Sequence, residues 1–221
     1  MRPFVSLTDA ACPMPYANID TDQLIPARFM RRPRSEGYGP YLLHDLRRGA
    51  DGELNPAFTL NDPTYAGAEI AVARRNFGSG SSREAAVYAL ADHGFRAVVA
   101  PSFGDIFAAN AVKNGLLPAR VDEAEAETLI AALSRGEATP VEIYLATQTI
   151  RCGAVAMSFA IDPVWKEQLL QGWDEIDLTL SASAAIESFW ARDKVARPWA
   201  SPRRQAADIG ASIAARILSE W

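Results

Sequence analysis

The sequence predicts an α/β fold, and three observations support that prediction. Short apolar runs that suit strands alternate with segments of helical periodicity from Ala68 onward. Of the 221 residues, 49% are hydrophobic and 22% charged, an ordinary composition for a soluble globular protein. A chain of 24.0 kDa can bury about 70% of its unfolded surface in one core.

The expected elements follow in chain order. Residues 13–63 are rich in proline, glycine and asparagine, and they predict loops with short elements. Strands and helices then alternate, at residues 68–73 (strand), 84–93 (helix), 97–100 (strand) and 103–114 (helix). A third helix is expected from Asp122 to about Arg135. Three strands and a proline-initiated helix complete the pattern, at residues 140–145, 148–151 and 155–160 and after Asp162.

The C-terminal residues form a separate piece of the predicted organisation. We expect a domain over residues 1–197 and a tail over residues 198–221. In that tail Ile209, Ile213 and Ile217 recur four residues apart, and this spacing predicts an amphipathic helix with one apolar stripe. Packing of the stripe on its own domain and docking against a partner or a second copy both stay open.

Charge and cysteine content exclude several classes of function. The 22 Lys and Arg residues against 27 Asp and Glu give a net charge of −5, which does not favour nucleic acid or anionic membranes as partners. With 2 cysteines and 2 histidines, we expect neither a disulfide framework nor a metal centre within this chain. The sequence has neither the pattern of a signal peptide nor that of a membrane span, so we expect a cytoplasmic location.

The most informative segment has the sequence RNFGSGSSRE at residues 75–84, between an expected strand and an expected helix. Its two glycines allow a close backbone approach to a ligand. A helix that begins after Ser81 or Ser82 would direct free N–H groups toward an anion. Arg83 adds a cation that suits a carboxylate or phosphate. The segment therefore predicts an anion cradle.

A structural role would explain part of the same segment. Ser81 and Glu84 have the spacing of a capping box, in which each side chain binds a free backbone N–H of the other residue. On spacing alone, Ser81 is better explained as a cap than as a catalytic residue. A cap does not account for two glycines, three serines and an arginine together. The segment matches neither a phosphate-binding loop nor a nucleophile elbow.

Two further polar groups precede this segment. Asp20 and Asp22 alternate along a stretch that we expect to be extended, so their carboxylates could share a polar site. A turn or helix cap explains the same residues equally well. A group of four arginines follows, and it predicts either an anion-binding loop or a solvated surface; its members are Arg28, Arg31, Arg32 and Arg34.

Taken in order, these segments resemble the small subunit of 3-isopropylmalate dehydratase, a member of the aconitase superfamily. Four stretches carry the resemblance: NIDTD and IPARF within residues 18–29, GYG and HDLR within 37–47, NFGSGSSRE at 76–84, and APSF, DIF and NGLLP within 100–118. The resemblance spans residues 20–180, and the chain beyond Arg197 lies outside it.

The resemblance implies a swivelling β/β/α domain of the aconitase and isopropylmalate isomerase type. Its flap, residues 27–40, would close over a large subunit that holds a four-iron four-sulfur cluster, while this chain holds no cofactor. The implied activity is that of a hydro-lyase, active only with the large subunit, which interconverts 2- and 3-isopropylmalate in leucine biosynthesis. Related dehydratases of dimethylmalate or methylmalate and a non-catalytic paralogue are the alternatives.

The same resemblance assigns the site residues. Ser81 would abstract the proton beside a substrate carboxylate. The substrate dicarboxylate would be bound by five further residues, which are Ser82, Arg83, Asp22, Arg28 and Arg34. Three departures from the family pattern leave the exact malate open: Arg75 in place of a common Glu, Ser79 in place of a common Cys, and Ala85 in place of His.

Overall fold

A computed structural model describes residues 1–134 and 139–200, and the chain divides into two compact units. The first unit, Met1–Asp177, contains every candidate site residue, and the second begins at Leu178. The division at residues 197 and 198 that the sequence suggests stays a prediction. The expected helix with the isoleucine stripe lies outside the described residues.

The described part of the first unit is built on a sheet of seven strands in the order β4-β3-β2-β1-β5-β6-β7. The strands are β1 (Ser6–Met14), β2 (Ile70–Ala73), β3 (Ala97–Ala100), β4 (Leu117–Arg120), β5 (Pro140–Tyr144), β6 (Thr149–Cys152) and β7 (Val155–Ser158). Strands β1 to β4 pair in parallel. Strand β1 also pairs antiparallel with β5, and β5 to β7 continue antiparallel. The central strand β1 thus joins the two halves of the sheet.

The helices differ in length before and after β2. Between β1 and β2 the helices are short: α1 (Thr21–Leu24), α2 (His44–Arg47), and the 3-10 helices η1 (Ala27–Arg31), η2 (Arg34–Glu36), η3 (Gly39–Tyr41), η4 (Thr59–Asn61) and η5 (Pro63–Tyr65). Most of those that follow are longer: α3 (Glu84–His93), α4 (Asp105–Lys113), α5 (Glu123–Leu133), α6 (Pro163–Gln171), α7 (Glu175–Ser181), α8 (Ser183–Ala196) and η6 (Pro198–Ala200). Among the helices in the described ranges, none has the length and apolar character needed to cross a bilayer.

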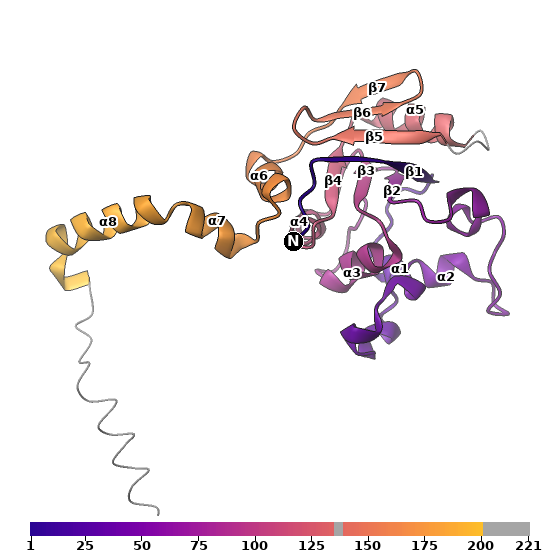
Figure 1. Cartoon of the computed structure of the whole chain (residues 1–221). Helices are drawn as coiled ribbons and strands as arrows, with labels where there is room; N and C mark the ends of the chain where they lie inside the picture. Colours follow the sequence, from indigo (N-terminus) through magenta and orange to yellow (C-terminus); the bar gives the residue numbers. More distant parts are fainter. Residues whose placement is uncertain (135–138, 201–221) are drawn as a thin grey trace, which may run out of the picture. The chain divides into compact units, whose positions relative to one another are not determined.

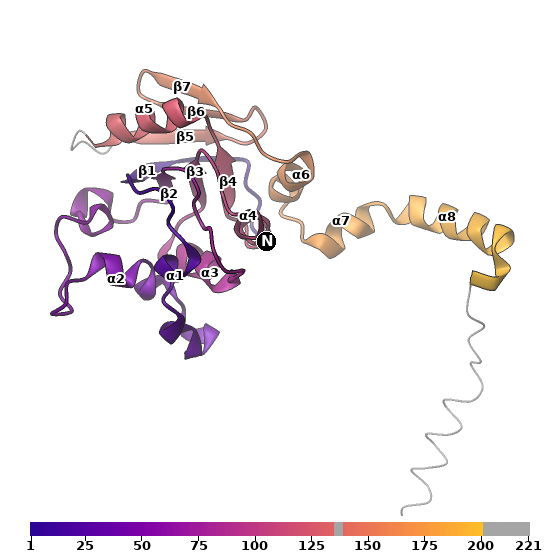
Figure 2. The ribbon, with the colours of Figure 1, turned by 180° about the vertical axis from the view of Figure 1, so that it is seen from behind.

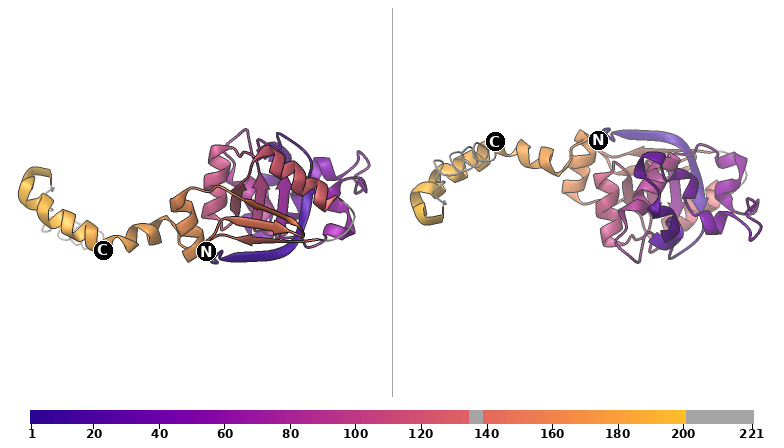
Figure 3. Two further views of the ribbon diagram at one scale, coloured as in Figure 1. Left: turned by 90° about the horizontal axis from the view of Figure 1, so that it is seen from above. Right: turned by 90° about the horizontal axis from the view of Figure 1, so that it is seen from below.

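Two hydrophobic cores cover the two faces of the parallel strands. Because successive strand residues point to opposite faces, Ala71 and Val98 belong to one core and Ile70 and Val99 to the other. Figures 1 and 2 show α1, α2 and α3 on one side of these strands and α5 with β5 to β7 on the other. Figure 3 shows the same layers from above, where the orange strands lie nearest, and from below, where the violet helices do. Burial on both faces explains the uninterrupted apolar runs of β2 and β3.

The structure confirms most expected elements and corrects some. Helix α3 and strand β3 have the predicted bounds, whereas α4 begins at Asp105 because the extended Gly104 is its N-cap residue. The sequence pattern predicts neither β1, where polar residues such as Thr8 interrupt the apolar run, nor β4, which contains Pro118. A proline is tolerated in β4 because this strand lies at the edge of the sheet.

Candidate functional site

Two loops that are distant in the sequence lie side by side beyond the carboxyl ends of β1 and β2. The segment of residues 75–84, which we call the serine motif, lies in the loop between β2 and the start of α3. The N–H of Gly78 donates to the carbonyl of Ile19 at 2.7 Å, and the N–H of Thr21 donates to the carbonyl of Ser79 at 2.9 Å. These bonds bring the two segments that the sequence analysis singled out separately into one site.

Two glycines allow the serine motif to pack closely on α4. Gly78 has a φ of +69°, and a Cβ built on it would lie 2.2 Å from the ring of Phe107. A Cβ on Gly104 would lie 2.5 Å from the carbonyl oxygen of Gly78. Any larger side chain at these positions would displace the loop. The glycines therefore serve loop packing, and they set the position of the serines that follow.

The reacting groups expected from the sequence lie at the exposed end of this loop. Ser81 and Ser82 are exposed and Arg83 is half-buried. The Arg83 guanidinium forms an ion pair with Asp22, which belongs to α1. Thr21, the residue before Asp22, donates from its hydroxyl to the carbonyl of Ser81 at 2.9 Å. The structure thus brings together four of the six predicted site residues.

The capping of α3 differs from the prediction, although the helix starts where the sequence predicts. The helix begins at Glu84, and Arg83 is its N-cap residue without a side-chain cap. The expected capping box of Ser81 and Glu84 does not form; Glu84 instead accepts a hydrogen bond from the Asn114 amide at 3.0 Å. Pairing with the loop of residues 18–22 holds the motif out of the helix. The Ser81 hydroxyl is therefore not used as a cap.

The prediction that Asp20 and Asp22 share an extended stretch is wrong. Asp20 is the N-cap of α1: its carboxylate accepts the N–H of Gln23 at 2.7 Å, and the Gln23 side chain accepts the N–H of Asp20 at 2.9 Å. This reciprocal pair is a complete capping box. The alternative explanation of a helix cap is thus confirmed for Asp20. Asp22, in the first turn of the same helix, is left to pair with Arg83.

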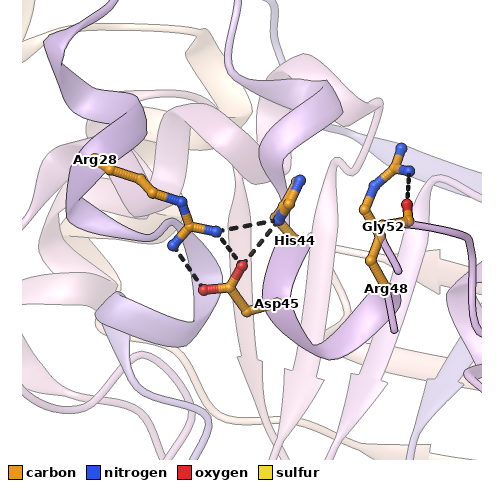
Figure 4. Close-up of polar contacts among 5 residues, drawn as sticks. All are labelled: Arg28, His44, Asp45, Arg48 and Gly52. Atoms are coloured by element: carbon orange, nitrogen blue, oxygen red, sulfur yellow. Dashed lines mark hydrogen bonds and ion pairs between the residues drawn. The ribbon is translucent and has the colours of Figure 1, made fainter. Parts of the chain in front are cut away.

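Arg28, a flap residue, belongs to a separate polar cluster with His44 and Asp45 of α2 (Figure 4). Its Nη1 donates to Asp45 at 2.8 Å, and its Nη2 pairs with the other carboxylate oxygen. The Nδ1 atom of His44 lies 2.9 Å from Asp45. The Arg28 guanidinium lowers the pKa of Asp45 to about 2. Arg48 donates to the carbonyl of Gly52 at 2.7 Å. Together with the three residues just named, it lines a shallow cavity of about 360 Å³.

Arg34 pairs with a carboxylate at the other end of α3. Its guanidinium forms two hydrogen bonds to Asp92, at 2.7 and 2.9 Å. Asp92 lies in the last turn of α3, eight residues after Glu84, which corresponds to roughly 12 Å along the helix axis. The predicted substrate contacts Arg28 and Arg34 therefore form their ion pairs with residues outside the serine motif.

The structure shows what two of the departures from the family pattern, Arg75 and Ala85, contact. Arg75 donates to Glu123 in the first turn of α5 at 2.8 Å, so its positive charge is balanced there. The neighbouring Arg74 binds Glu127 of the same helix through two hydrogen bonds. Ala85 is partly buried and packs against the core beneath α3. The charge of Arg75 is therefore paired, and Ala85 adds none.

The cysteines do not form a metal site. Cys12 and Cys152 are free and buried, and they belong to different cores. Burial raises the pKa of the Cys12 thiol to about 12, so this group stays protonated at neutral pH. In the part of the chain that the structure describes, no group of three or more His, Cys, Asp or Glu side chains could hold a metal ion.

A half-parallel sheet that carries an exposed serine motif beyond its strand ends defines the class of this protein as an α/β domain with its candidate site at the carboxyl ends of the parallel strands. Residues 1–124 match the family model of the aconitase C-terminal domain. The fold class expected from the sequence is thereby confirmed. The relatives then specify the family.

A 3-isopropylmalate dehydratase small subunit from Teredinibacter turnerae is 42% identical over 208 residues, covering 90% of this chain and 97% of that protein. The corresponding subunit of Afipia carboxidovorans is 45% identical over 201 residues, covering 90% and 100%. The chain therefore belongs to the family of 3-isopropylmalate dehydratase small subunits. A crystal structure of 3-isopropylmalate dehydratase from Methanocaldococcus jannaschii has the same fold, with a TM-score of 0.59 at 24% identity over 83% of this chain and 98% of that one.

Proposed function

We propose that this chain is the small subunit of a hydro-lyase that interconverts 2- and 3-isopropylmalate by dehydration and rehydration in leucine biosynthesis, in the cytoplasm. The observation that carries the proposal is the exposed Ser81 beside the Arg83–Asp22 pair, in a chain that is 42% and 45% identical to named small subunits. The chain acts together with a large subunit, and its substrate is a small dicarboxylate.

Ser81 is proposed to take up the proton next to a substrate carboxylate. A neutral serine hydroxyl is a poor base, so Ser81 must take up the proton as an alkoxide, and this negatively charged form requires positive potential nearby. The Arg83 guanidinium and the free N–H groups at the start of α3 supply that potential. Preorganised donors of this kind contribute about 3 kcal/mol each in other enzymes.

Arg83 is suited to bind one substrate carboxylate. The guanidinium has five N–H donors, and the Nη1 group is the one that binds Asp22. Donors therefore remain for a substrate, while Asp22 fixes the orientation of the side chain. Ser82 adds a hydroxyl donor from the neighbouring position. This arrangement gives Asp22 an indirect part in substrate binding.

Arg28 and Arg34 are assigned to the flap that covers the substrate. Each guanidinium uses Nη1 and Nη2 on its carboxylate partner and keeps further N–H donors. The four-iron four-sulfur cluster that the resemblance assigns to the large subunit supplies, when bound there, a Lewis acid for the substrate hydroxyl. The small subunit contributes the base and the carboxylate contacts.

Reconstitution with the large subunit tests the proposal. The full chain is co-purified with the large dehydratase subunit of its own organism, and hydration of 2-isopropylmaleate is compared with that of dimethylmaleate and methylmaleate. We expect the isopropyl compound to give the highest kcat/KM. Preference for dimethylmaleate or methylmaleate would contradict the substrate assignment. An assembled, cluster-loaded complex without any turnover would favour the non-catalytic paralogue.

A further inference from the structure

A single carboxylate, that of Asp92, holds two parts of the flap. Its two oxygens accept hydrogen bonds from the Arg34 guanidinium at 2.7 and 2.9 Å. One of these oxygens also accepts the backbone N–H of Tyr38 at 2.7 Å. The Asp92 side chain is 21% exposed, so these bonds are partly shielded from water. A side-chain contact and a backbone contact thus meet on one residue of α3.

Arg34 also packs against an aromatic ring on α3. Tyr88 lies one helical turn before Asp92, and the Arg34 guanidinium lies 4.4 Å from the centre of its ring. The guanidinium is also 5.5 Å from the ring of Tyr38 within the flap. Cation–π contacts at these distances add to the ion pair. Arg34 is therefore fixed by a carboxylate and two aromatic rings.

The flap backbone touches the end of α3 directly. A Cβ built on Gly39 would lie 2.6 Å from the carbonyl oxygen of Asp92 and 2.8 Å from the backbone nitrogen of His93. Only glycine permits this approach without a shift of the backbone. Within the flap, the Tyr38 hydroxyl donates to the carbonyl of Arg32 at 3.1 Å.

The position of Asp92 is not explained by helix stability. A negative charge in the last turn of a helix interacts unfavourably with the helix dipole. The carboxylate is nevertheless present there, and its three hydrogen bonds all go to the flap. The serine motif lies at the opposite end of the same helix. Helix α3 is thus the rigid connection between the flap and the proposed base.

We infer that Asp92 is a positioning residue, which sets the flap relative to the serine motif and thereby determines the affinity for the dicarboxylate substrate. This inference rests on the proposed function. Asp92 acts through Arg34 and Tyr38 and does not itself contact the substrate.

The inference is tested with Asp92→Asn in the complex with the large subunit. We expect KM for 2-isopropylmaleate to rise at least about fivefold, with kcat within about twofold, because binding weakens while Ser81 is unchanged. Asp193→Asn is the matched control. Asp193 of α8 forms an ion pair with Arg197 at 2.6 Å, and its side chain is 21% exposed, like that of Asp92. An unchanged KM in Asp92→Asn would overturn the inference. A lower KM would also overturn it, because Asp92 would then compete with the substrate for Arg34.

Limited digestion with trypsin gives a readout that does not need turnover. In the isolated full chain, cleavage after Arg31 and Arg34 should be several times faster in Asp92→Asn than in the wild type and in Asp193→Asn. Thermal unfolding of each variant verifies that it is folded, and Arg34→Lys, which keeps the charge without the paired geometry, should show an intermediate rate. Equal cleavage rates would overturn the inference. If the wild-type complex has no turnover, the proposed function fails, and digestion still decides whether Asp92 holds the flap.

Discussion

Each of the three arginines proposed to bind the substrate has a carboxylate partner in this structure. Arg83 pairs with Asp22, and the flap residues Arg28 and Arg34 pair with Asp45 and Asp92. Fixed guanidinium groups lose little conformational entropy when a substrate carboxylate binds. The charged side chains of the site are therefore oriented before the substrate arrives.

The pair of Arg28 and Asp45 predicts a pH-dependent contribution to stability. Arg28 lowers the pKa of Asp45 to about 2, from about 4 in an unfolded chain. A lowered pKa stabilises the folded chain above the unfolded value, so the contribution is present above about pH 4 and is lost as the pH falls through about 2. Urea unfolding of wild type and Asp45→Asn should differ at pH 6 and converge toward pH 2. The difference is modest, since both side chains are about half exposed and salt screens them. A constant difference across this range would contradict the assignment.

Single residues were only partly predictable. The sequence places Ser81, Arg83 and Asp22 in dense polar motifs, the resemblance to the family marks them as candidate site residues, and the structure brings them together. It contains no local signal for Thr21 as the donor to the Ser81 carbonyl, or for Asp92 as the partner of Arg34, because each bond joins residues about sixty positions apart. Long-range partners depend on the arrangement of the elements, which local periodicity does not show.

At the scale of elements, the serine motif is held by what it packs against. Gly78 packs against Phe107 of α4. The carbonyls of Ser79 and Ser81 accept hydrogen bonds from Thr21, at the start of α1. This double attachment delays the start of α3 to Glu84 and leaves the hydroxyls outside the helix. The capping-box spacing of Ser81 and Glu84 is a correct local pattern that tertiary contacts override.

Gly78→Ala tests the packing on α4. Both Gly78 and Gly80 have positive φ, +69° and +90°, but a Cβ on Gly78 would overlap the ring of Phe107, whereas one on Gly80 would come no closer than 3.5 Å to Asp20. We expect Gly78→Ala to lower the free energy of unfolding by about 3 kcal/mol and Gly80→Ala by about 1 kcal/mol, measured by urea denaturation. Equal effects of the two substitutions would show that backbone strain alone, and not the contact with α4, constrains the loop.

Elements with strong local signals were predictable, and those that depend on their neighbours were not. Helix α5 begins after Asp122, whose N–H donates to the Glu125 side chain at 3.0 Å, and α6 begins at Pro163 after the Asp162 cap, as the sequence indicates. The central strand β1 has polar residues in its first half, and its place in the sheet follows from pairing with β2 and β5. A pattern confined to one segment cannot reveal such pairing.

At the scale of the whole molecule, the strand order creates the site. Because β1 and β2 are parallel neighbours, the loops at their carboxyl ends meet, although about sixty residues separate them in the chain. The carboxyl ends of parallel strands are the usual place for a ligand site in α/β proteins. The sequence predicts both loops as functional segments, and the resemblance to the family implies that they act together. The topology provides the physical reason.

The central claim is that Ser81 is the base of the dehydratase reaction, and one substitution tests it directly. Ser81→Ala is assembled with the large subunit, assembly is verified by size-exclusion chromatography, and the rate of 2-isopropylmaleate hydration is measured at saturating substrate. We predict that kcat falls by about a hundredfold or more while the amount of complex is unchanged, because general base catalysis is lost. A complex of Ser81→Ala that keeps kcat within about tenfold of the wild type would contradict the account.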